Sequence, residues 1–176
     1  MKKFLVVVDI QKDFVDGSLG TKEAQGIIEN AAQKIKSFDG EIFVTFDTHF
    51  NNYLETSEGN KLPVSHCIKG TDGWNLDEKI ASALTNRQYT PVEKLSFGSL
   101  SLPRLIKTAA GNEPFEIELI GLCTDICVVS NALILKASFP EMRISVDAKC
   151  CAGVTPELHN AAIMTMQSCQ IDIVNQ

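Results

Sequence analysis

The stretch Phe4-Leu5-Val6-Val7-Val8-Asp9, continued by Ile10-Gln11-Lys12-Asp13-Phe14, indicates the fold class of this chain. Five consecutive apolar residues, mostly β-branched, predict a strand that is buried on both faces. Strands of this kind are typical of parallel sheets that have helices on each side. The same pattern recurs along the chain, and we predict six strands: Phe4–Asp9, Glu41–Asp47, Tyr89–Glu93, Phe115–Gly121, Arg143–Ala148 and Gln170–Val174.

Helical patterns separate these strands. Ala24–Phe38 carries apolar residues at the spacing of one helix face. Similar stretches predict four further helices: Leu76–Leu84, Leu100–Ala110, Asp125–Ser138 and Pro156–Ser168. Alternating strands and helices predict an α/β fold with a mostly parallel, six-stranded sheet, and residues 1–176 suit a single domain. The segment Thr48–Trp74 does not fit this alternation, and loops of that length inside compact domains are usually functional.

Composition and charge exclude several classes of protein. Hydrophobic residues make up 44% and charged residues 22% of the 176 residues, which excludes a disordered or low-complexity chain. The net charge is −6 and no basic stripe is present, so we expect no nucleic-acid partner and no membrane partner. The start of the chain has no signal-peptide pattern, and we expect a cytoplasmic protein whose six cysteines are reduced. Adjacent Cys150 and Cys151 are expected to be buried at a strand end, where they would pack as small apolar residues without a chemical role.

Reactive side chains follow several of the predicted strands. Asp9 ends the first strand, Asp47 ends the second, Lys94 follows the third, and Cys123 and Cys127 follow the fourth. Ligands of open α/β sheets bind at the carboxyl ends of the strands, so these residues are expected to converge there.

Cys127 is the best candidate for a nucleophile. We expect it in the first turn of a helix, where the helix dipole and a nearby Lys94 would lower the pKa of the thiol. Asp9 could take the thiol proton and later give it to a leaving amine. Free N–H groups at the helix start could hold an oxyanion. Taken singly, each residue has a plain structural alternative: a buried cysteine, a strand-end carboxylate and a surface lysine.

A second group of polar residues predicts a metal site. Asp47 and His49 flank Thr48, and His66 lies further along the same long loop. Imidazole and carboxylate ligands suit zinc, iron or manganese better than calcium or magnesium. Either Glu55 or Glu58 could add a further carboxylate, while two ordinary polar loop residues remain the structural alternative.

Taken together, these motifs resemble the isochorismatase-like cysteine hydrolase family, and within it most of all the nicotinamidase (pyrazinamidase) branch. The resemblance covers nearly the whole chain. The segments that carry it are Val8–Phe14, Asp47-Thr48-His49, Glu58-Gly59, Leu62–Thr71, Glu93-Lys94, Ser96-Phe97 and Gly121–Val128.

This resemblance implies a three-layer α/β/α fold and a catalytic triad of Asp9, Lys94 and Cys127. It also implies a cis peptide bond between Leu122 and Cys123, with an oxyanion hole formed by the backbone N–H groups of Cys123 and Cys127. The implied substrate-binding residues are Phe14, Leu122 and Cys123. The implied ligands of one divalent metal ion are Asp47, His49, His66 and Glu58; we expect zinc, with iron or manganese as alternatives.

The implied reaction is hydrolysis of nicotinamide to nicotinate and ammonia through a cysteine thioester, which would serve NAD salvage. The alternative within the family is hydrolysis of another small amide or ureido compound. A noncatalytic α/β protein is the third hypothesis. The chain has Leu62-Pro63 where many nicotinamidases have an aromatic residue before the proline, so Phe50 or Tyr53 could supply the aromatic wall. Members of the family often assemble, and we expect a homo-oligomer.

Overall fold

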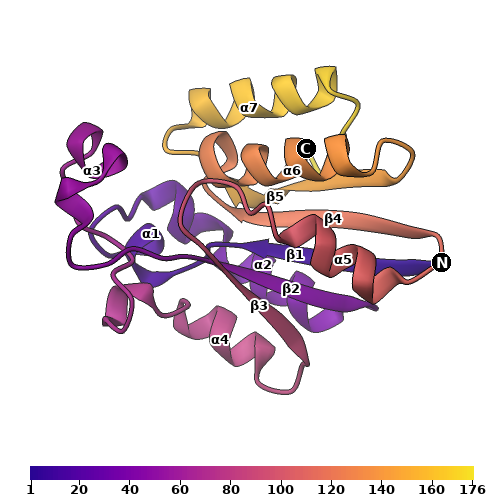
Figure 1. Cartoon of the computed structure of the whole chain (residues 1–176), viewed down its shortest axis with the longest axis horizontal. Coiled ribbons are helices and arrows are strands. Elements are labelled where there is room, and N and C mark those ends of the chain that lie inside the picture. Colours follow the sequence, from indigo (N-terminus) through magenta and orange to yellow (C-terminus); the bar gives the residue numbers. More distant parts are fainter.

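A computed structural model describes all residues, 1–176, and consists of one sheet with helices on both faces (Figure 1). The strands are β1 (Lys2–Val8), β2 (Glu41–Asp47), β3 (Tyr89–Lys94), β4 (Phe115–Leu122), β5 (Arg143–Ala152) and β6 (Asp172–Val174). Their order in the sheet is β3-β2-β1-β4-β5-β6, and every neighbouring pair is parallel. The predicted α/β/α fold is confirmed, and the sheet is parallel throughout.

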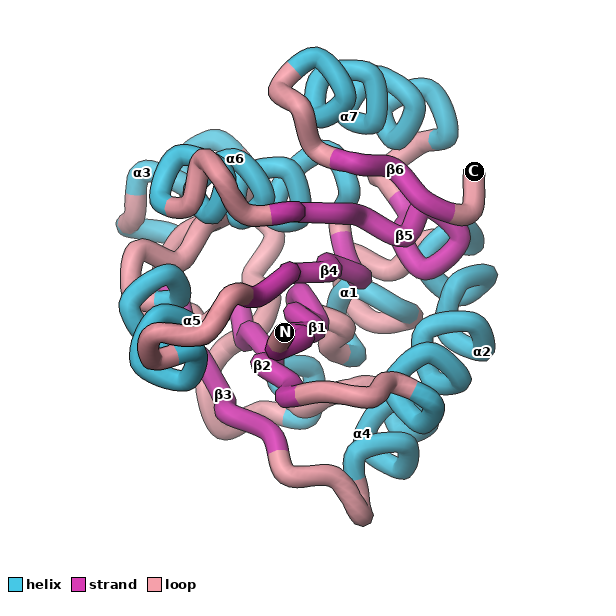
Figure 2. Tube along the Cα trace, turned by 90° about the vertical axis from the view of Figure 1, so that its right-hand side faces the viewer, coloured by secondary structure: helices cyan, strands magenta, loops and turns pink.

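The helices that cover the sheet divide into two layers (Figure 2). On one side lie α2 (Lys22–Ser37) and α4 (Glu78–Leu84); on the other lie α5 (Leu102–Ala110), α6 (Val129–Ser138) and α7 (Pro156–Ser168). Because successive side chains of a strand point to opposite faces, β1 supplies both cores. Leu5 and Val7 pack against the α2 side, whereas Phe4, Val6 and Val8 pack against the other.

Three features of the chain differ from the sequence prediction. The long loop contains three short helical turns, Tyr53–Glu55, α3 (Ser57–Lys61) and Asp72–Trp74, and the short helix α1 (Lys12–Val15) follows β1. Strand β5 continues to Ala152, and its register with β4 shifts on the way, so Cys150 and Cys151 lie within the strand. All six cysteines are free, and both of these are buried as expected.

The start of the predicted helix Asp125–Ser138 is also different. A π-helical turn over Thr124–Val128 precedes α6, so Cys127 lies in this turn instead of in an ordinary α-helical first turn. Helices α2, α4 and α5 each start two residues from the predicted position, and α7 starts at Pro156 as predicted. The Thr155 hydroxyl accepts the N–H of Leu158 at the first turn of α7.

The strand order reverses direction between β1 and β4. Chain connections from β1 run to β2 and β3 on one side, and β4 leads to β5 and β6 on the other. Such a switch point opens a crevice at the carboxyl ends of the strands. In Figure 1 this is the edge opposite the N-terminus, where α3 lies. No helix of the chain combines the length and the apolar character needed to cross a membrane.

Candidate active site

Four polar side chains meet at the carboxyl edge of the sheet, as the sequence predicted. Asp9 follows β1, and Asp47 and Lys94 are the last residues of β2 and β3, where they pair in register. Cys127 lies in the π-helical turn that follows β4. Because β1 and β4 are neighbours at the switch point, Asp9 and Cys127 come from opposite sides of the same crevice.

The carboxylate of Asp9 is completely buried and held from two sides. Its backbone has a φ of 47°, which turns the chain sharply as it leaves β1. The Thr45 hydroxyl donates to Oδ1 over 2.6 Å, and the Lys94 Nζ lies 2.6 Å from Oδ2. Burial raises the pKa of Asp9, and the charge of Lys94 only partly opposes this shift. Asp9 is therefore a carboxylate with an increased affinity for a proton.

Lys94 is the centre of the polar cluster. Besides the contact with Asp9, its Nζ donates to Asp47 Oδ1 over 3.1 Å, to the Ser96 carbonyl over 3.0 Å and to Cys127 Sγ over 3.5 Å. Burial by itself would lower the pKa of Lys94, but the charges of Asp9, Cys127 and Asp47 raise it above its usual value. The ammonium stays charged and provides the positive charge next to the thiol.

The expected lowering of the Cys127 pKa is wrong for this structure. The thiol is 4% exposed, and burial raises its pKa well above the usual value. The Asp9 carboxylate raises it further, and Lys94, which lowers it, is outweighed. The physical reason is that the free-energy cost of removing a thiolate from water exceeds the stabilisation that one nearby ammonium provides. The resting side chain is therefore a neutral thiol, which accepts a hydrogen bond from the Lys94 ammonium.

The backbone before Cys127 has the geometry that the resemblance implies. The peptide bond between Leu122 and Cys123 is cis. Gly121 has a φ of 125°, and a Cβ at this position would collide with the Val8 carbonyl of the neighbouring strand. Only glycine fits there. The side chain of Leu122, which we expected to bind substrate, is instead completely buried in the core on the α2 side.

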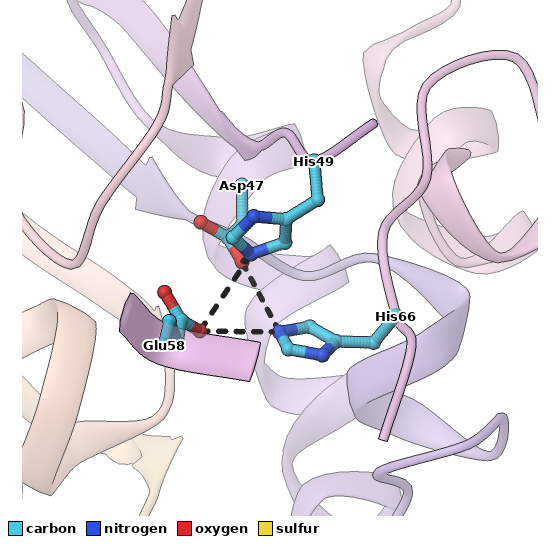
Figure 3. Close-up of side chains that lie close together, drawn as sticks. All are labelled: Asp47, His49, Glu58 and His66. Carbon is cyan, nitrogen blue, oxygen red and sulfur yellow. Dashed lines mark hydrogen bonds and ion pairs between the residues drawn. The ribbon is translucent and has the colours of Figure 1, made fainter. Parts of the chain in front are cut away.

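The second group of residues forms a compact cluster of metal-ligand types (Figure 3). One ligand atom from each of Asp47, His49, Glu58 and His66 lies within 4.8 Å of all the others. Asp47 Oδ2 is 3.0 Å from His49 Nε2 and 3.6 Å from His66 Nε2. Glu58 Oε1 lies 3.6 Å from each of these two nitrogens. Glu58 therefore belongs to the cluster and exposed Glu55 does not, which resolves the choice that the sequence left open.

The surroundings of the two histidines direct their Nε2 atoms toward a common point. His66 Nδ1 lies 2.8 Å from the Val64 carbonyl oxygen, which fixes the ring orientation in the manner of a metal ligand. The ring of Tyr53 packs edge-on against both imidazoles, and its hydroxyl donates to the Leu62 carbonyl. Tyr53 thus supports the histidines and does not line the cavity next to Cys127.

The donor set fits a divalent cation. Two carboxylates and two imidazoles, three of the four residues being buried, match the ligands that zinc, iron and manganese take in proteins. Burial alone would lower the pKa of His66, but the neighbouring carboxylates of Asp47 and Glu58 raise it to about 9. The cluster therefore stabilises positive charge at the point where the four side chains converge.

A cavity of about 260 Å³ joins the two groups. Cys127 and Cys123 line one part of it, and Asp47, Glu58 and His66 line another. The remaining walls are mostly apolar and include Phe14, Leu19, Leu62, Phe97, Ile126 and Val154. A small ring that carries a polar group would fit between the thiol and the metal-ligand cluster.

Sequence reasoning missed three residues that shape this site. Thr45 holds the Asp9 carboxylate, and Gln11 fixes Asp47 by accepting its N–H and donating to its carbonyl oxygen. Phe97 lines the cavity, whereas Phe50 is 51% exposed and does not. The sequence could have indicated a role for Gln11 and Phe97, because they lie next to Asp9 and Lys94 in the chain. Thr45 lies inside a strand and gave no signal.

Comparison with known proteins places the chain in a class and then in a family. The chain is a hydrolase of the α/β type. It belongs to the isochorismatase family, because the isochorismatase domain of that family matches residues 3–175.

Relatives and solved structures agree with this placement. An uncharacterised isochorismatase family protein, PncA, of Bacillus subtilis is 30% identical over 173 residues, which cover 93% of each chain. The pyrazinamidase/nicotinamidase of Streptococcus mutans superposes with a TM-score of 0.83 at 26% identity, over 98% of this chain and all of the other. A pyrazinamidase of Pyrococcus horikoshii, solved in complex with zinc, has the same fold, with a TM-score of 0.81 at 22% identity over the full length of both chains.

Proposed function

We propose that this chain hydrolyses nicotinamide to nicotinate and ammonia, with Asp9, Lys94 and Cys127 as its catalytic residues. One observation carries the proposal: the thiol of Cys127 and the ligand cluster around His66 line the same small, largely apolar cavity. Nicotinamide carries a ring nitrogen and a carboxamide at two separate positions of a flat ring, and these two polar groups match the two polar parts of the cavity. The similarity to the Streptococcus mutans enzyme supports the same reading.

The first half of the proposed reaction forms a thioester. Asp9 takes the proton from the Cys127 thiol while the sulfur attacks the carboxamide carbon, so the S–C bond forms and the carbonyl oxygen becomes an oxyanion. Backbone N–H groups of Cys123 and Cys127 hold this oxyanion. Asp9 then gives its proton to the amide nitrogen, the C–N bond breaks and ammonia leaves. A carboxylate with a raised pKa suits both transfers.

The second half returns the enzyme to its starting state. Water attacks the thioester carbon and loses a proton to Asp9 as the C–O bond forms. The C–S bond then breaks, Asp9 returns its proton to the sulfur, and nicotinic acid leaves and gives its carboxyl proton to solvent, which yields nicotinate. Throughout, Lys94 keeps its positive charge next to Asp9 and Cys127, and so it stabilises whichever of the two is ionised.

The ring of the substrate is held by residues of this cavity. Asp47, His49, Glu58 and His66 would hold one divalent metal ion, which when bound supplies a Lewis-acid position for the pyridine nitrogen. Phe14 and Phe97 provide aromatic walls for the ring, and Leu62 lines the cavity where many nicotinamidases carry an aromatic residue. We propose zinc as the metal because the ligand types suit it and because the Pyrococcus horikoshii pyrazinamidase was solved with zinc.

We further predict three properties of this chain: a role in NAD salvage, a cytoplasmic location and assembly into a homo-oligomer. Gel filtration with light scattering of the purified chain tests the last of these. Neither nucleic acid nor membrane is expected as a partner, given the net charge of −6.

Ammonia release from nicotinamide by the purified protein tests the function. We expect turnover that is lost in Cys127→Ala and after chelation, and that returns when zinc is added to the chelated parent. Absence of turnover in the zinc-loaded parent would reject nicotinamide as the substrate. A panel of other small amides and ureido compounds, assayed in the same way, then tests the alternative within the family.

A further inference from the structure

A buried asparagine links the nucleophile turn to the loop that follows Lys94. Asn131 lies in α6, one helical turn after Cys127, and is completely buried. Its Oδ1 accepts the N–H of Ser99 over 2.9 Å. Its Nδ2 donates to the Phe97 carbonyl over 3.2 Å and to the Cys127 carbonyl over 2.8 Å.

The loop between β3 and α5 depends on this side chain for its position. Gly98 lies so close to α6 that a Cβ there would collide with the side chain of Ile134. Within the loop, Ser99 Oγ accepts the N–H of Leu102, so the segment after Phe97 has its own local bonds to α5. The side-chain bonds from α6 to Phe97 and Ser99 all come from Asn131.

The position of this loop affects the cavity directly. Phe97 lines the cavity, yet Phe97 is 43% exposed. Packing of its side chain alone therefore does not hold the residue in position. Its backbone is held on both sides of Gly98, at the Phe97 carbonyl and at the Ser99 N–H, by one amide group. Only Asn or Gln offers a donor pair and an acceptor in one planar group, and Asn has the shorter reach. An apolar residue at this position would leave buried backbone groups without partners.

We propose that Asn131 is a positioning residue for substrate binding, which holds the Phe97 loop so that the phenyl ring forms one wall of the cavity. The inference rests on the proposed function in that it concerns the ring-binding part of the same site. It predicts that Asn131 acts through Phe97, and therefore that the two residues are energetically coupled.

A double-mutant cycle on the KM for nicotinamide tests this coupling. We expect Phe97→Ala and Asn131→Thr each to raise KM by up to about tenfold, because an aromatic contact is lost in both. Thr in a helix can still donate to the carbonyl four residues earlier, so Asn131→Thr keeps the bond to Cys127 and removes those to the loop. The double variant should have the KM of Phe97→Ala alone, with kcat little changed throughout.

A second measurement does not depend on amidase activity. Cys127 is alkylated with N-phenylmaleimide and with N-methylmaleimide, and the ratio of the two rates is read from the Cys127 peptide by mass spectrometry. The parent should prefer the ring-bearing reagent, and Phe97→Ala and Asn131→Thr should lose this preference to the same extent. Asn30→Ala is the matched control, because it removes one amide donor to the Lys149 carbonyl at a distance from the cavity.

The outcomes separate the two proposals. A parent that does not turn over nicotinamide, yet loses its ring preference in Asn131→Thr, would reject the proposed substrate and keep Asn131 as a positioning residue. Additive effects on KM, or an unchanged ring preference together with a lower melting temperature, would reject the positioning role. In that case Asn131 would serve folding only.

Discussion

Two clusters in this molecule, one buried and one partly buried, each combine an aspartate, a lysine and a cysteine. One is the active-site cluster of Asp9, Lys94 and Cys127. We call the other, formed by Lys34, Asp147 and Cys150, the α2 cluster. In it Lys34 Nζ lies 2.7 Å from Asp147 Oδ2, and burial together with the charge of Asp147 raises the pKa of Cys150. The same three residue types thus occur twice, once at the carboxyl edge of the sheet and once beneath α2.

The two clusters differ in what surrounds them. The active-site cluster lies at the carboxyl ends of the strands, and its thiol lines a cavity. The α2 cluster lies beneath α2, and none of its three residues lines that cavity. Its lysine also pairs with Glu118 over 2.8 Å, and its aspartate accepts from the side chain of Asn175, which anchors the C-terminal end.

This difference shows that residue types alone do not make a reactive site. In both clusters burial raises the pKa of the thiol, so a low thiol pKa does not distinguish them. What distinguishes the active-site cluster is space for a substrate next to the sulfur. Matched substitutions in the two clusters can therefore test which surroundings make a cysteine reactive.

The largest expected effect separates the two cysteines. Cys127→Ala should lower kcat for nicotinamide by at least about 10³-fold, because a covalent nucleophile is lost. Cys150→Ala should leave kcat unchanged and lower only the stability. Steady-state ammonia release together with a urea melt measures both; an equal loss of kcat in the two variants would contradict the comparison.

The two aspartates should differ in a similar way. Asp9→Asn should lower kcat by about 10²–10⁴-fold, because the group that transfers protons is lost. It should also speed alkylation of Cys127 by iodoacetamide at pH 7, since the Asp9 carboxylate raises the thiol pKa. Asp147→Asn should change neither quantity. Slower alkylation in Asp9→Asn would mean that Asp9 promotes thiolate formation at rest, which is the opposite of the expected effect.

Removal of a metal ligand should affect binding more than bond cleavage. Loss of a residue that only hydrogen-bonds a metal ligand weakens metal binding by about 10–100-fold. His49→Ala removes a ligand itself, so it should weaken zinc binding by at least this much and should raise KM for nicotinamide. Metal content measured by mass spectrometry after dialysis checks this. His159→Ala is the control, because this histidine lies on α7 outside the cluster. Unchanged zinc content in His49→Ala would remove His49 from the site.

The two lysines should have different effects on the reactive thiol. Lys94 lowers the pKa of Cys127, so Lys94→Met should slow alkylation of Cys127 by up to about tenfold, which corresponds to one pKa unit. Lys34→Met should leave that rate unchanged. Equal rates in the parent and in Lys94→Met would reject the role of Lys94 as the residue that favours the thiolate.

The smallest expected effect concerns stability at high pH. Burial raises the pKa of Cys150, so the unfolded state loses this proton at a lower pH than the folded state. The free energy of unfolding should therefore fall as the pH rises above the usual thiol pKa of about 8.5. Cys150→Ala should reduce this slope by at most about 1.4 kcal/mol per pH unit, measured by urea melts between pH 8 and pH 10. Solvent-exposed Cys169→Ala is the control; an identical slope in parent and Cys150→Ala would contradict the prediction.

The sequence by itself determined the fold class and the location of the site. The apolar run in β1 and the alternation of strands and helices require a covered parallel sheet, because such strands have no polar face to turn toward water. Reactive residues at strand ends must then meet at one edge, which is why Asp9, Lys94 and Cys127 could be grouped from their positions alone.

The choice among similar residues was decided by the tertiary structure. Whether Glu55 or Glu58 joins the metal-ligand cluster depends on the turn of the chain through α3, and hydrophobic pattern does not specify such turns. Phe97 lines the cavity beside Phe14, whereas Phe50 and Tyr53 do not, and the hydrophobic pattern does not specify this either. Leu122, which matched a substrate-binding motif, faces the core because side chains alternate along a strand.

The thiol pKa shows the limit of the sequence most clearly. Sequence position placed Cys127 near a helix start and a lysine, and both features lower a thiol pKa. The fold then buried the sulfur and placed the negative charge of Asp9 near it, and these two effects are stronger. A sequence determines which groups are near one another along strands and helices. How far each group is removed from water, and hence its proton affinity, depends on the packing of the whole fold.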